Sequence, residues 1–253
     1  MLHRNRLESI KQIIQIEKKI SVSELSEKFH VTTETIRRDL ARLESDGILT
    51  RTHGGAVINS NSVIENSSFI LRANHHNHEK RIIAELVRGL IPKSAVIASD
   101  ASSTSVEAVR LLRDESNITI LTNSTQILSE SYGASFRVVS TGGAVNTNTF
   151  SMQGSIARNV LMSLYADIVI LSCKALSMSG VIFDSNEDEA EIKKIMVERG
   201  QKIILLADHS KFDMVAFVKL LDVENLDVLV TDREPSDEWK NLLHDKNVKL
   251  IYG

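Results

Sequence analysis

Several features are scarce or absent in this chain of 253 residues, and each absence excludes a class of protein. Cys173 is the only cysteine, so no disulfide can form within the chain, and a reducing compartment such as the cytoplasm is expected. No apolar run approaches the roughly 20 residues that a membrane-spanning helix needs, and the N-terminus lacks the apolar segment of a signal peptide. Neither a GxGxxG nor a GxxxxGKS loop is present, which argues against a dinucleotide or ATP, and we predict no cofactor.

What is present is the composition of a soluble globular protein, with 42% hydrophobic and 25% charged residues. The length accommodates one large or two modest domains. The net charge of −3 argues at first against nucleic acid as a partner. Residues 1–58, however, contain ten Lys/Arg and eight Asp/Glu, so that this part is +2 and the remainder −5. The local charge therefore matters more than the total.

A helix-turn-helix is predicted within residues 20–57. On a helix that starts after Thr32, a good N-cap, one narrow face is apolar and must be buried, namely Ile36, Leu40 and Leu43. The opposite face and its flanks carry polar side chains and arginines. A second amphipathic segment, 23–29, precedes this helix and is separated from it by only two residues. Two short helices on a tight turn, with arginines pointing outward, fit a DNA-reading unit because arginine can bind guanine through two hydrogen bonds.

A small β-hairpin is predicted directly after these helices. Gly47 permits a turn, and residues 48–53 then alternate apolar and polar side chains before Gly54 and Gly55. This pattern is typical of the wing of a winged helix. The alternative is an ordinary helical hairpin with a solvated charged face, since short motifs also occur by chance. The candidate DNA-binding residues are Thr33, Glu34, Thr35, Arg37, Arg38, Arg42, Arg51 and His53. Arg4, Arg6 and Lys11 could either contact phosphates or lie on a solvated face.

The Asn/Ser-rich run at 59–68 is the clear linker of the sequence. We therefore expect a DNA-binding domain at 1–58, a linker at 59–72 and a second domain at 73–253. Three histidines follow the linker, in the stretch 74–80. His75 and His78 could share a helical face, but no carboxylate or cysteine pattern completes a metal site. We predict no metal there and a solvated helix start instead.

From Ala95 onward, short β-branched runs alternate with helical ones. This alternation predicts a mostly parallel α/β sheet with helices on both faces. Strands are expected at 95–99, 118–122, 136–140, 167–171, 202–207, 226–231 and 248–252. Helices are expected at 103–114, 125–132, 155–164, 188–199 and 235–244.

Polar residues follow the predicted strands, where an open α/β sheet binds its ligands. Residues 102–104 open a helix and can offer hydroxyls and amides to an anion, and Lys211 supplies a compact positive charge. The set suits a phosphate on a small polyol, although polar strand ends also serve simply to cap helices. The candidate effector-binding residues are Asp100, Ser102, Ser103, Thr104, Thr122, Asn123, Gly142, Gly143, Lys174, Asp208 and Lys211.

The motif TIRRDL, followed by a leucine, a glycine and RTHGGAV, resembles the DeoR family of bacterial transcriptional repressors. Thr32 replaces the serine usual in that family. The stretch 100–104, Thr122-Asn123, Gly142-Gly143, Gly154 and Asp208-x-Ser210-Lys211 resemble the effector domain of the same family, which is similar in fold to ribose-5-phosphate isomerase. The similarity covers nearly the whole chain. Ser102 stands where the family commonly has glycine, and 172–177 departs from the family's glycine-rich form.

The resemblance implies an N-terminal winged helix-turn-helix followed by a sugar-phosphate-sensing α/β domain. It implies a repressor of a carbohydrate operon, with operator DNA and a phosphorylated sugar as partners. A single reading helix contacts few base pairs, so we also expect a homodimer or homotetramer.

A sugar-phosphate isomerase of similar fold is the main alternative from another class. Such an enzyme needs an acid/base pair beside the sugar carbonyl. The loop that would align with its catalytic loop, 172–177, contains no carboxylate, and Asp184, Glu187 and Glu189 lie further along, where acidic residues favour a helix start. We therefore predict binding without catalysis. Cys173 fits a small buried hydrophobe better than a redox switch.

Overall fold

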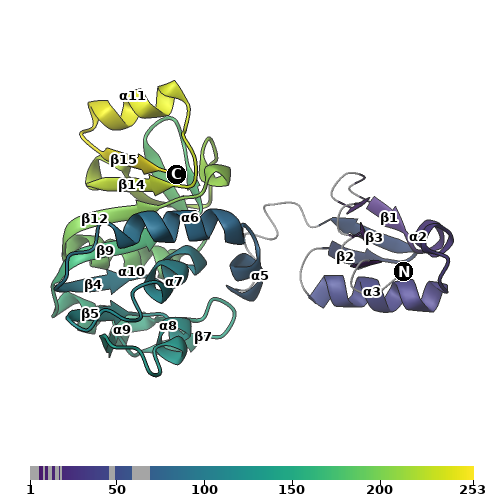
Figure 1. The fold of residues 1–253 in the computed structure, drawn as a ribbon, viewed down its shortest axis with the longest axis horizontal. Helices are drawn as coiled ribbons and strands as arrows, with labels where there is room; N and C mark the ends of the chain where they lie inside the picture. Colours follow the sequence, from purple (N-terminus) through teal and green to yellow (C-terminus); the bar gives the residue numbers. More distant parts are fainter. Residues whose placement is uncertain are drawn as a thin grey trace. The chain divides into compact units, whose positions relative to one another are not determined.

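The computed structural model describes residues 6–7, 9–10, 13–14, 17, 19–45, 49–58 and 69–253 (Figure 1). The chain divides into two compact units, Met1–Arg72 and Ala73–Gly253, called here the N-terminal unit and the C-terminal unit. The turn predicted at Gly47, the linker run 59–68, and both Arg4 and Lys11 lie outside the described residues. Among the described helices, none combines the length and the apolar character that a membrane span requires.

The N-terminal unit contains the predicted helix-turn-helix and wing. Helix α2 (Val22–Phe29) ends at His30, and α3 (Thr33–Ser45) begins after Thr32, whose hydroxyl accepts a hydrogen bond from the Thr35 amide at 3.2 Å. Thr32 is thus confirmed as an N-cap. Strands β2 (Leu49–Thr52) and β3 (Gly55–Ile58) form an antiparallel hairpin. The predicted apolar face is confirmed, because Ile36, Leu40 and Leu43 are fully buried in one cluster, which also contains Ile10 and Ile14.

A third strand, β1 (Lys19–Ser21), was not predicted and pairs antiparallel with β3. Three residues are too few to show an alternating pattern, so the strand exists only through this pairing. Its backbone lies so close to β3 that a Cβ on Gly55 would stand 1.9 Å from the Ile20 carbonyl oxygen. Glycine at position 55 is therefore required by the close approach of the two strands.

The C-terminal unit is built on one seven-stranded sheet whose order is β15-β14-β12-β9-β4-β5-β6. Every neighbouring pair in it is parallel, which confirms the predicted parallel sheet. The strands are β4 (Ala95–Ser99), β5 (Ile118–Thr122), β6 (Arg137–Ser140), β9 (Ala166–Ser172), β12 (Gly200–Leu206), β14 (Val228–Thr231) and β15 (Lys249–Tyr252). All their carboxyl ends consequently meet at one edge.

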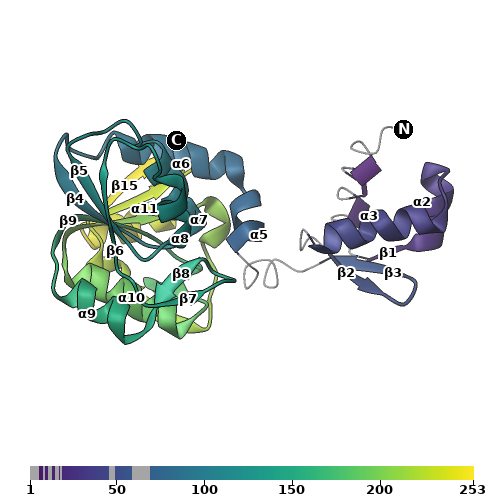
Figure 2. The same ribbon diagram turned by 90° about the horizontal axis from the view of Figure 1, so that it is seen from below.

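Helices cover both faces of this sheet (Figures 1 and 2). On one side lie α6 (Asn77–Arg88), α7 (Ser103–Arg110) and α8 (Thr125–Glu130); on the other lie α9 (Gly154–Met162) and α10 (Glu187–Glu198). Helix α11 (Asp237–Asp245) joins the α9 and α10 side, because Trp239 and Leu243 belong to the same apolar cluster as Leu161 and Met196. Helix α5 (Phe69–Asn74) precedes α6.

Strands and helices do not alternate as strictly as the sequence predicted. A hairpin of β7 (Ala144–Asn146) and β8 (Ser151–Gln153) follows β6. A separate antiparallel sheet contains β10 (Ala175–Leu176), β11 (Val181–Asp184) and β13 (Val218–Asp222). Two short 3-10 turns, η1 (His209–Lys211) and η2 (Val223–Asn225), were also missed. These insertions are too short to show a periodic sequence pattern, and they form through pairing with distant segments of the chain.

Candidate nucleic-acid interface and ligand site

The outer face of α3 presents arginine side chains to solvent, as the sequence predicted. The Arg37 and Arg38 side chains are 64% and 81% exposed. Their guanidinium groups are only loosely held, since the Glu34 carboxylate lies 3.5 Å from Arg38 Nε and 4.0 Å from Arg37 Nη1. Exposed pairs of this kind contribute little to stability. These guanidinium groups can therefore exchange Glu34 for another acceptor at little cost.

A groove of about 540 Å³ separates α3 from the wing. Thr33 and Arg37 line it from α3, and Arg51 and His53 line it from the β2–β3 hairpin. The structure thus gathers four of the eight predicted DNA-binding residues around one depression. Of the other four, Glu34, Arg38 and Arg42 are exposed on α3, whereas Thr35 is partly buried and its hydroxyl lies 2.9 Å from that of Thr32.

Two basic residues of the N-terminal unit have structural partners that the sequence did not reveal. Arg6 is 7% exposed, and its Nε lies 2.6 Å from Asp39 Oδ2, so the guanidinium faces α3 rather than solvent. The possibility that Arg6 contacts phosphates is wrong for this arrangement, because the buried carboxylate of Asp39 holds it. Arg51 donates from its backbone amide and from Nε to Glu44, at 2.9 and 2.6 Å, and these hydrogen bonds lower the pKa of Glu44.

At the predicted ligand edge of the C-terminal unit, Asp100 is the centre of a buried ionic cluster. Its Oδ1 accepts hydrogen bonds from the Ser102 hydroxyl (2.7 Å) and amide (3.3 Å). Its Oδ2 lies 3.1 Å from Lys193 Nζ and accepts from the Ser172 amide at 3.3 Å. The same Nζ lies 2.6 Å from Asp184 Oδ2. Asp100 is 1% exposed, so we assign it to holding the strand ends together rather than to direct ligand contact.

Lys193 is a charged residue of the ligand edge that sequence reasoning missed. Burial opposes the charge on its ammonium group, but Asp184 and Asp100 outweigh burial and raise its pKa. The available signal was its place on α10, where Lys193 occupies a buried position beside Ala190, Ile192 and Met196. A lysine on an apolar helix face requires a buried partner of opposite charge.

Several of the predicted tip residues have structural roles. Ser102 accepts a hydrogen bond from the Ser105 amide at 3.2 Å and so caps α7. The Thr122 hydroxyl donates to the Ser99 carbonyl at 2.8 Å and accepts from the Ser124 amide at 3.0 Å. Gly142 and Gly143 have φ of +62° and +110°, as the turn into β7 requires. Ser102 therefore fits the alternative interpretation, in which a polar residue at a strand end caps the following helix.

Asn123 differs from its neighbours. Its Nδ2 donates to the Met152 carbonyl at 3.2 Å, but its Oδ1 is buried and is the one such side-chain oxygen in the described residues without a hydrogen-bond partner. Buried acceptors are nearly always satisfied in folded proteins. An unsatisfied amide oxygen at the ligand edge is therefore suited to accept a hydrogen bond from a hydroxyl of a ligand.

The ends of β9 and β12 bring Lys174 and Lys211 together although they are far apart in the sequence. Burial, and then the positive charge of Lys211, lower the pKa of Lys174 to about 7, with Asp184 acting in the opposite sense. Burial also opposes ionisation of Asp208, yet Lys211 and the Ser210 hydroxyl lower its pKa overall. Two neighbouring ammonium groups attract an anion, and its binding would relieve their mutual repulsion.

Cys173, which directly precedes Lys174 in sequence, is buried, and burial raises the pKa of its thiol to about 12. Because the thiolate is the reactive form, the thiol is unreactive near neutral pH.

The histidines around the start of α6 differ in part from the expected solvated helix start. His78 is exposed as expected, but His75 and His76 are half-buried in the C-terminal unit. In the described part of the chain, no three or more His, Cys, Asp or Glu side chains are grouped so as to hold a metal ion. His75 and His76 instead approach the Asp208–Lys211 region, because the charges of Lys211 and Asp208 both act on His75.

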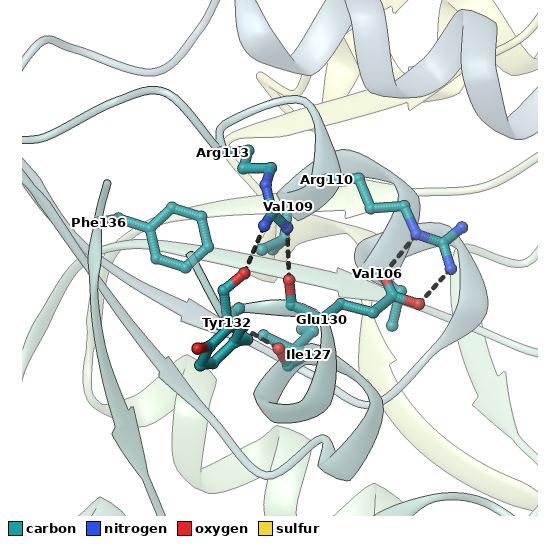
Figure 3. A pocket seen from close by; sticks show the side chains of 9 residues that line it. Val106, Val109, Arg110, Arg113, Ile127, Glu130, Tyr132 and Phe136 are labelled. Carbon is teal, nitrogen blue, oxygen red and sulfur yellow. Dashed lines mark hydrogen bonds and ion pairs between the residues drawn. The ribbon is translucent and has the colours of Figure 1, made fainter. Parts of the chain in front are cut away.

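A pocket of about 350 Å³ lies between α7 and α8 (Figure 3). Val106, Val109, Ile127 and Phe136 form its apolar wall, with arginines at its rim. The rim is internally paired: Arg110 lies 2.5 Å from Glu107 and from Glu130, and Arg113 donates to the carbonyls of Glu130 and Tyr132. These pairs join α7 to the chain around α8, and we assign no ligand to this pocket.

Two family models match the chain. The DeoR-like helix-turn-helix domain matches residues 6–62, and the DeoR C terminal sensor domain matches residues 75–233. The HTH-type transcriptional regulator GolR of Listeria innocua is 32% identical over 230 residues, which is 90% of each chain. The L-fucose operon activator of Haemophilus influenzae is 33% identical and covers 97% of this chain and 98% of its own.

The glycerol-3-phosphate regulon repressor of Escherichia coli is 27% identical and covers 99% of both chains. Among solved structures, a D-ribose-5-phosphate isomerase in complex with phospho-erythronic acid aligns with a TM-score of 0.42 and 17% identity, over 55% of this chain and 56% of that one. A likeness at this level carries no argument about activity.

Proposed function

The chain belongs to the DeoR family of transcriptional regulators, and from this premise we propose that it represses a carbohydrate-utilisation operon and leaves its operator when a phosphorylated sugar binds. The relatives named above are regulators, so this chain is a regulator rather than an enzyme. One of them is named an activator and another a repressor. The single observation that supports a phosphorylated effector is that two lysines, Lys174 and Lys211, act on each other through their positive charges at the ligand edge.

In this proposal α3 enters the major groove of operator DNA. Arg38 and Arg37 are exposed on its outer face and reach base edges or phosphates. The groove between α3 and the wing accommodates one backbone strand, with His53 and Arg51 beside it. Thr33, Glu34, Thr35 and Arg42 complete the proposed contact surface.

The effector lies across the ends of β5, β4, β9 and β12, which are adjacent in the sheet. Four neighbouring strands span about 15 Å, which suits a small sugar phosphate. Its phosphate binds Lys211 and Lys174 and the first-turn amides of α7, at Ser103 and Thr104. A sugar hydroxyl donates to Asn123 Oδ1, the unsatisfied acceptor.

Because one reading helix contacts few base pairs, we propose that the protein acts in the cytoplasm as a homodimer or homotetramer. Effector binding changes the spacing or orientation of the paired DNA-binding units. Such coupling is typically about 1–3 kcal/mol and is reciprocal, so operator DNA should weaken effector binding by the same factor. Sedimentation that finds a monomer both free and on DNA would refute the assembly.

The effector is tested by a thermal-shift screen of pentose, hexose and deoxyhexose phosphates, with the free sugars as controls. A true effector raises the melting temperature and releases DNA taken from the region upstream of the gene in a gel-shift assay. The free sugar should do neither, because each lost charge-assisted hydrogen bond costs roughly 1.5–3 kcal/mol.

Lys211→Ala should abolish both responses while DNA binding persists, because the DNA-binding residues belong to the other unit. Lys249→Ala, which removes an exposed lysine on β15, is the matched control and should respond like the wild type. A Lys211→Ala variant that still responds, or free sugars that act as well as phosphates, would show that the proposed pocket is wrong.

A further inference from the structure

The turn that joins α5 to α6 lies against the ligand edge of the C-terminal unit. Its two histidines touch, with the His75 and His76 rings perpendicular and their centroids 3.9 Å apart. The His76 ring centroid is 5.7 Å from that of His209, which belongs to η1 after β12. His209 is itself held by Asp232, whose Oδ2 lies 2.7 Å from His209 Nδ1. A chain of rings therefore connects this turn to the ends of β12 and β14.

The charges at the ligand edge act directly on this turn. Burial, followed by the charges of His76, Lys80 and Lys211, lowers the pKa of His75 to about 4, and Asp208 acts in the opposite sense. His75 is consequently neutral near pH 7, and a neutral imidazole can donate one hydrogen bond to an anion. His76 likewise helps to lower the pKa of Asp208. Both histidines thus lie within electrostatic reach of η1.

The backbone of the turn is also unusual. His76 has φ of +55° and ψ of +40°, the left-handed conformation that non-glycine residues rarely adopt. His76 is also the N-cap residue of α6 and makes no side-chain capping hydrogen bond. Helix α6 packs along α7 (Figure 1), and both helices begin at the edge where the parallel strands end. The conformation of the turn therefore places two imidazoles at the N-terminus of α6, beside η1.

We propose that His75 and His76 bind the phosphate of the effector together with Lys211, and that this turn transmits the presence of the ligand to the DNA-binding unit. The inference rests on the proposed function and assigns two further binding residues to the same site. The ligand class is a phosphate monoester. The route is short in sequence, since α5 ends at Asn74 and the boundary between the two units lies at Arg72 and Ala73. A phosphate drawn toward Lys211 pulls on a turn that continues directly into the connection between the units.

Inorganic phosphate is the probe for direct contact, read by two-dimensional NMR of the histidine rings in the full chain. Titration should shift the ring resonances of His75 and His76 and leave those of His78 unchanged. The variants His75→Asn, His76→Asn and His78→Asn assign the signals one at a time. Asparagine tolerates the left-handed conformation of position 76, so that variant keeps the turn. In Lys211→Ala the phosphate shifts should disappear.

The same variants test transmission. His75→Asn and His76→Asn should each weaken phosphate binding by about tenfold, as loss of one hydrogen bond to a charged group predicts. At saturating concentrations of the sugar phosphate found by the screen, they should also release less operator DNA than the wild type does. His78→Asn is the matched control and should behave like the wild type.

The outcomes separate this inference from the proposed function. If neither inorganic phosphate nor any sugar phosphate binds the wild type, the proposal of a phosphorylated effector is refuted, and so is the proposed role of the turn. If Lys211→Ala loses phosphate binding but His75→Asn and His76→Asn both retain it, the effector site stands and the contact with the turn is refuted. If phosphate binding weakens in the histidine variants while operator release is unchanged at saturating ligand, the contact stands and transmission through the turn is refuted.

Discussion

The arginines of α3 and the ionic cluster at the ligand edge use their charges in opposite ways. In the N-terminal unit, the arginines of α3 are largely exposed and only loosely paired with Glu34. In the C-terminal unit, Asp100, Asp184 and Lys193 are buried and hold one another at 2.6–3.1 Å. A surface that searches along DNA needs long side chains that can exchange partners, whereas a site that selects one small ligand needs groups already fixed in place. The comparison predicts that removing an exposed arginine of α3 costs affinity, whereas removing a member of the buried Asp100–Lys193–Asp184 cluster costs stability.

The largest effect is expected from Lys193→Ala. Removing the ammonium group leaves two carboxylates buried without compensation, which should lower the unfolding free energy by about 3–5 kcal/mol. Trp239 is the only tryptophan and is buried in the C-terminal unit, so denaturation followed by its fluorescence reports on this unit alone. Lys194→Ala, an exposed neighbour, is the control and should change stability by less than about 0.5 kcal/mol. An equal loss of unfolding free energy in both variants would show that the buried lysine contributes no more to stability than its exposed neighbour.

A smaller effect, on DNA affinity rather than on stability, is expected from Arg38→Ala. The change should weaken binding to the operator by about 1–3 kcal/mol, concentrated at one base position, because a guanidinium–guanine contact is lost. The fluorescence transition of Trp239 should not move. Competition binding with operator variants measures the loss. Operator affinity equal to that of the wild type would refute the assignment of α3 as the reading helix.

The pH dependence of effector binding tests whether the positive charge of Lys174 contributes to binding of the anion. Its pKa is lowered to about 7, so its positive charge is lost as the pH rises through that value. An anion prefers the charged form, and the dissociation constant of a sugar phosphate should therefore rise above pH 7, by at most about tenfold per pH unit.

Calorimetry between pH 7.5 and 9 is the suitable measurement, since a phosphate monoester with a second pKa of about 6 is then already dianionic. Lys174→Arg retains its charge throughout this range and should give a flatter profile. The same slope in both proteins would exclude Lys174 as the titrating group.

The smallest effect is expected from Arg51→Ala. If Arg51 contacts a phosphate, the variant should bind all sequences slightly more weakly, and the slope of log affinity against log salt should fall by about one. Arg51 is also hydrogen-bonded to Glu44 on α3. A variant that melts earlier but keeps the salt slope of the wild type would show that Arg51 only attaches the wing to α3.

Local sequence patterns were sufficient to predict much of this fold. Strands 95–99 and 118–122 have the predicted bounds, because a buried parallel strand is a short, mostly apolar run followed by polar residues. The apolar face of α3 was predicted from periodicity alone, as was Thr32 as its cap. These features depend on residues within a few positions of one another.

The features that were missed depend on contacts between distant segments. The buried positions of Arg6 and Lys193 follow from partners 33 and up to 93 positions away, at Asp39 and Asp100. His75 and His76 were expected in solvent because the sequence does not show that η1 lies beside them. Contacts between distant segments also decide whether each polar residue at a strand end has a structural or a ligand-binding role. Asp100, Ser102 and Thr122 have partners inside the fold, whereas Asn123 Oδ1 has none.

The strand order of the sheet also determines how it can be assembled during synthesis. Strand β4 is the first of the seven to be made, yet it lies in the interior, between β5 and β9. The segment β4-β5-β6 can pair as soon as residue 140 is available, while the other side of β4 remains an open edge until β9 is made. Strands β12, β14 and β15 then add outward in the order of translation. We expect a chain that stops before residue 166 to expose the apolar edge of β4 and to aggregate.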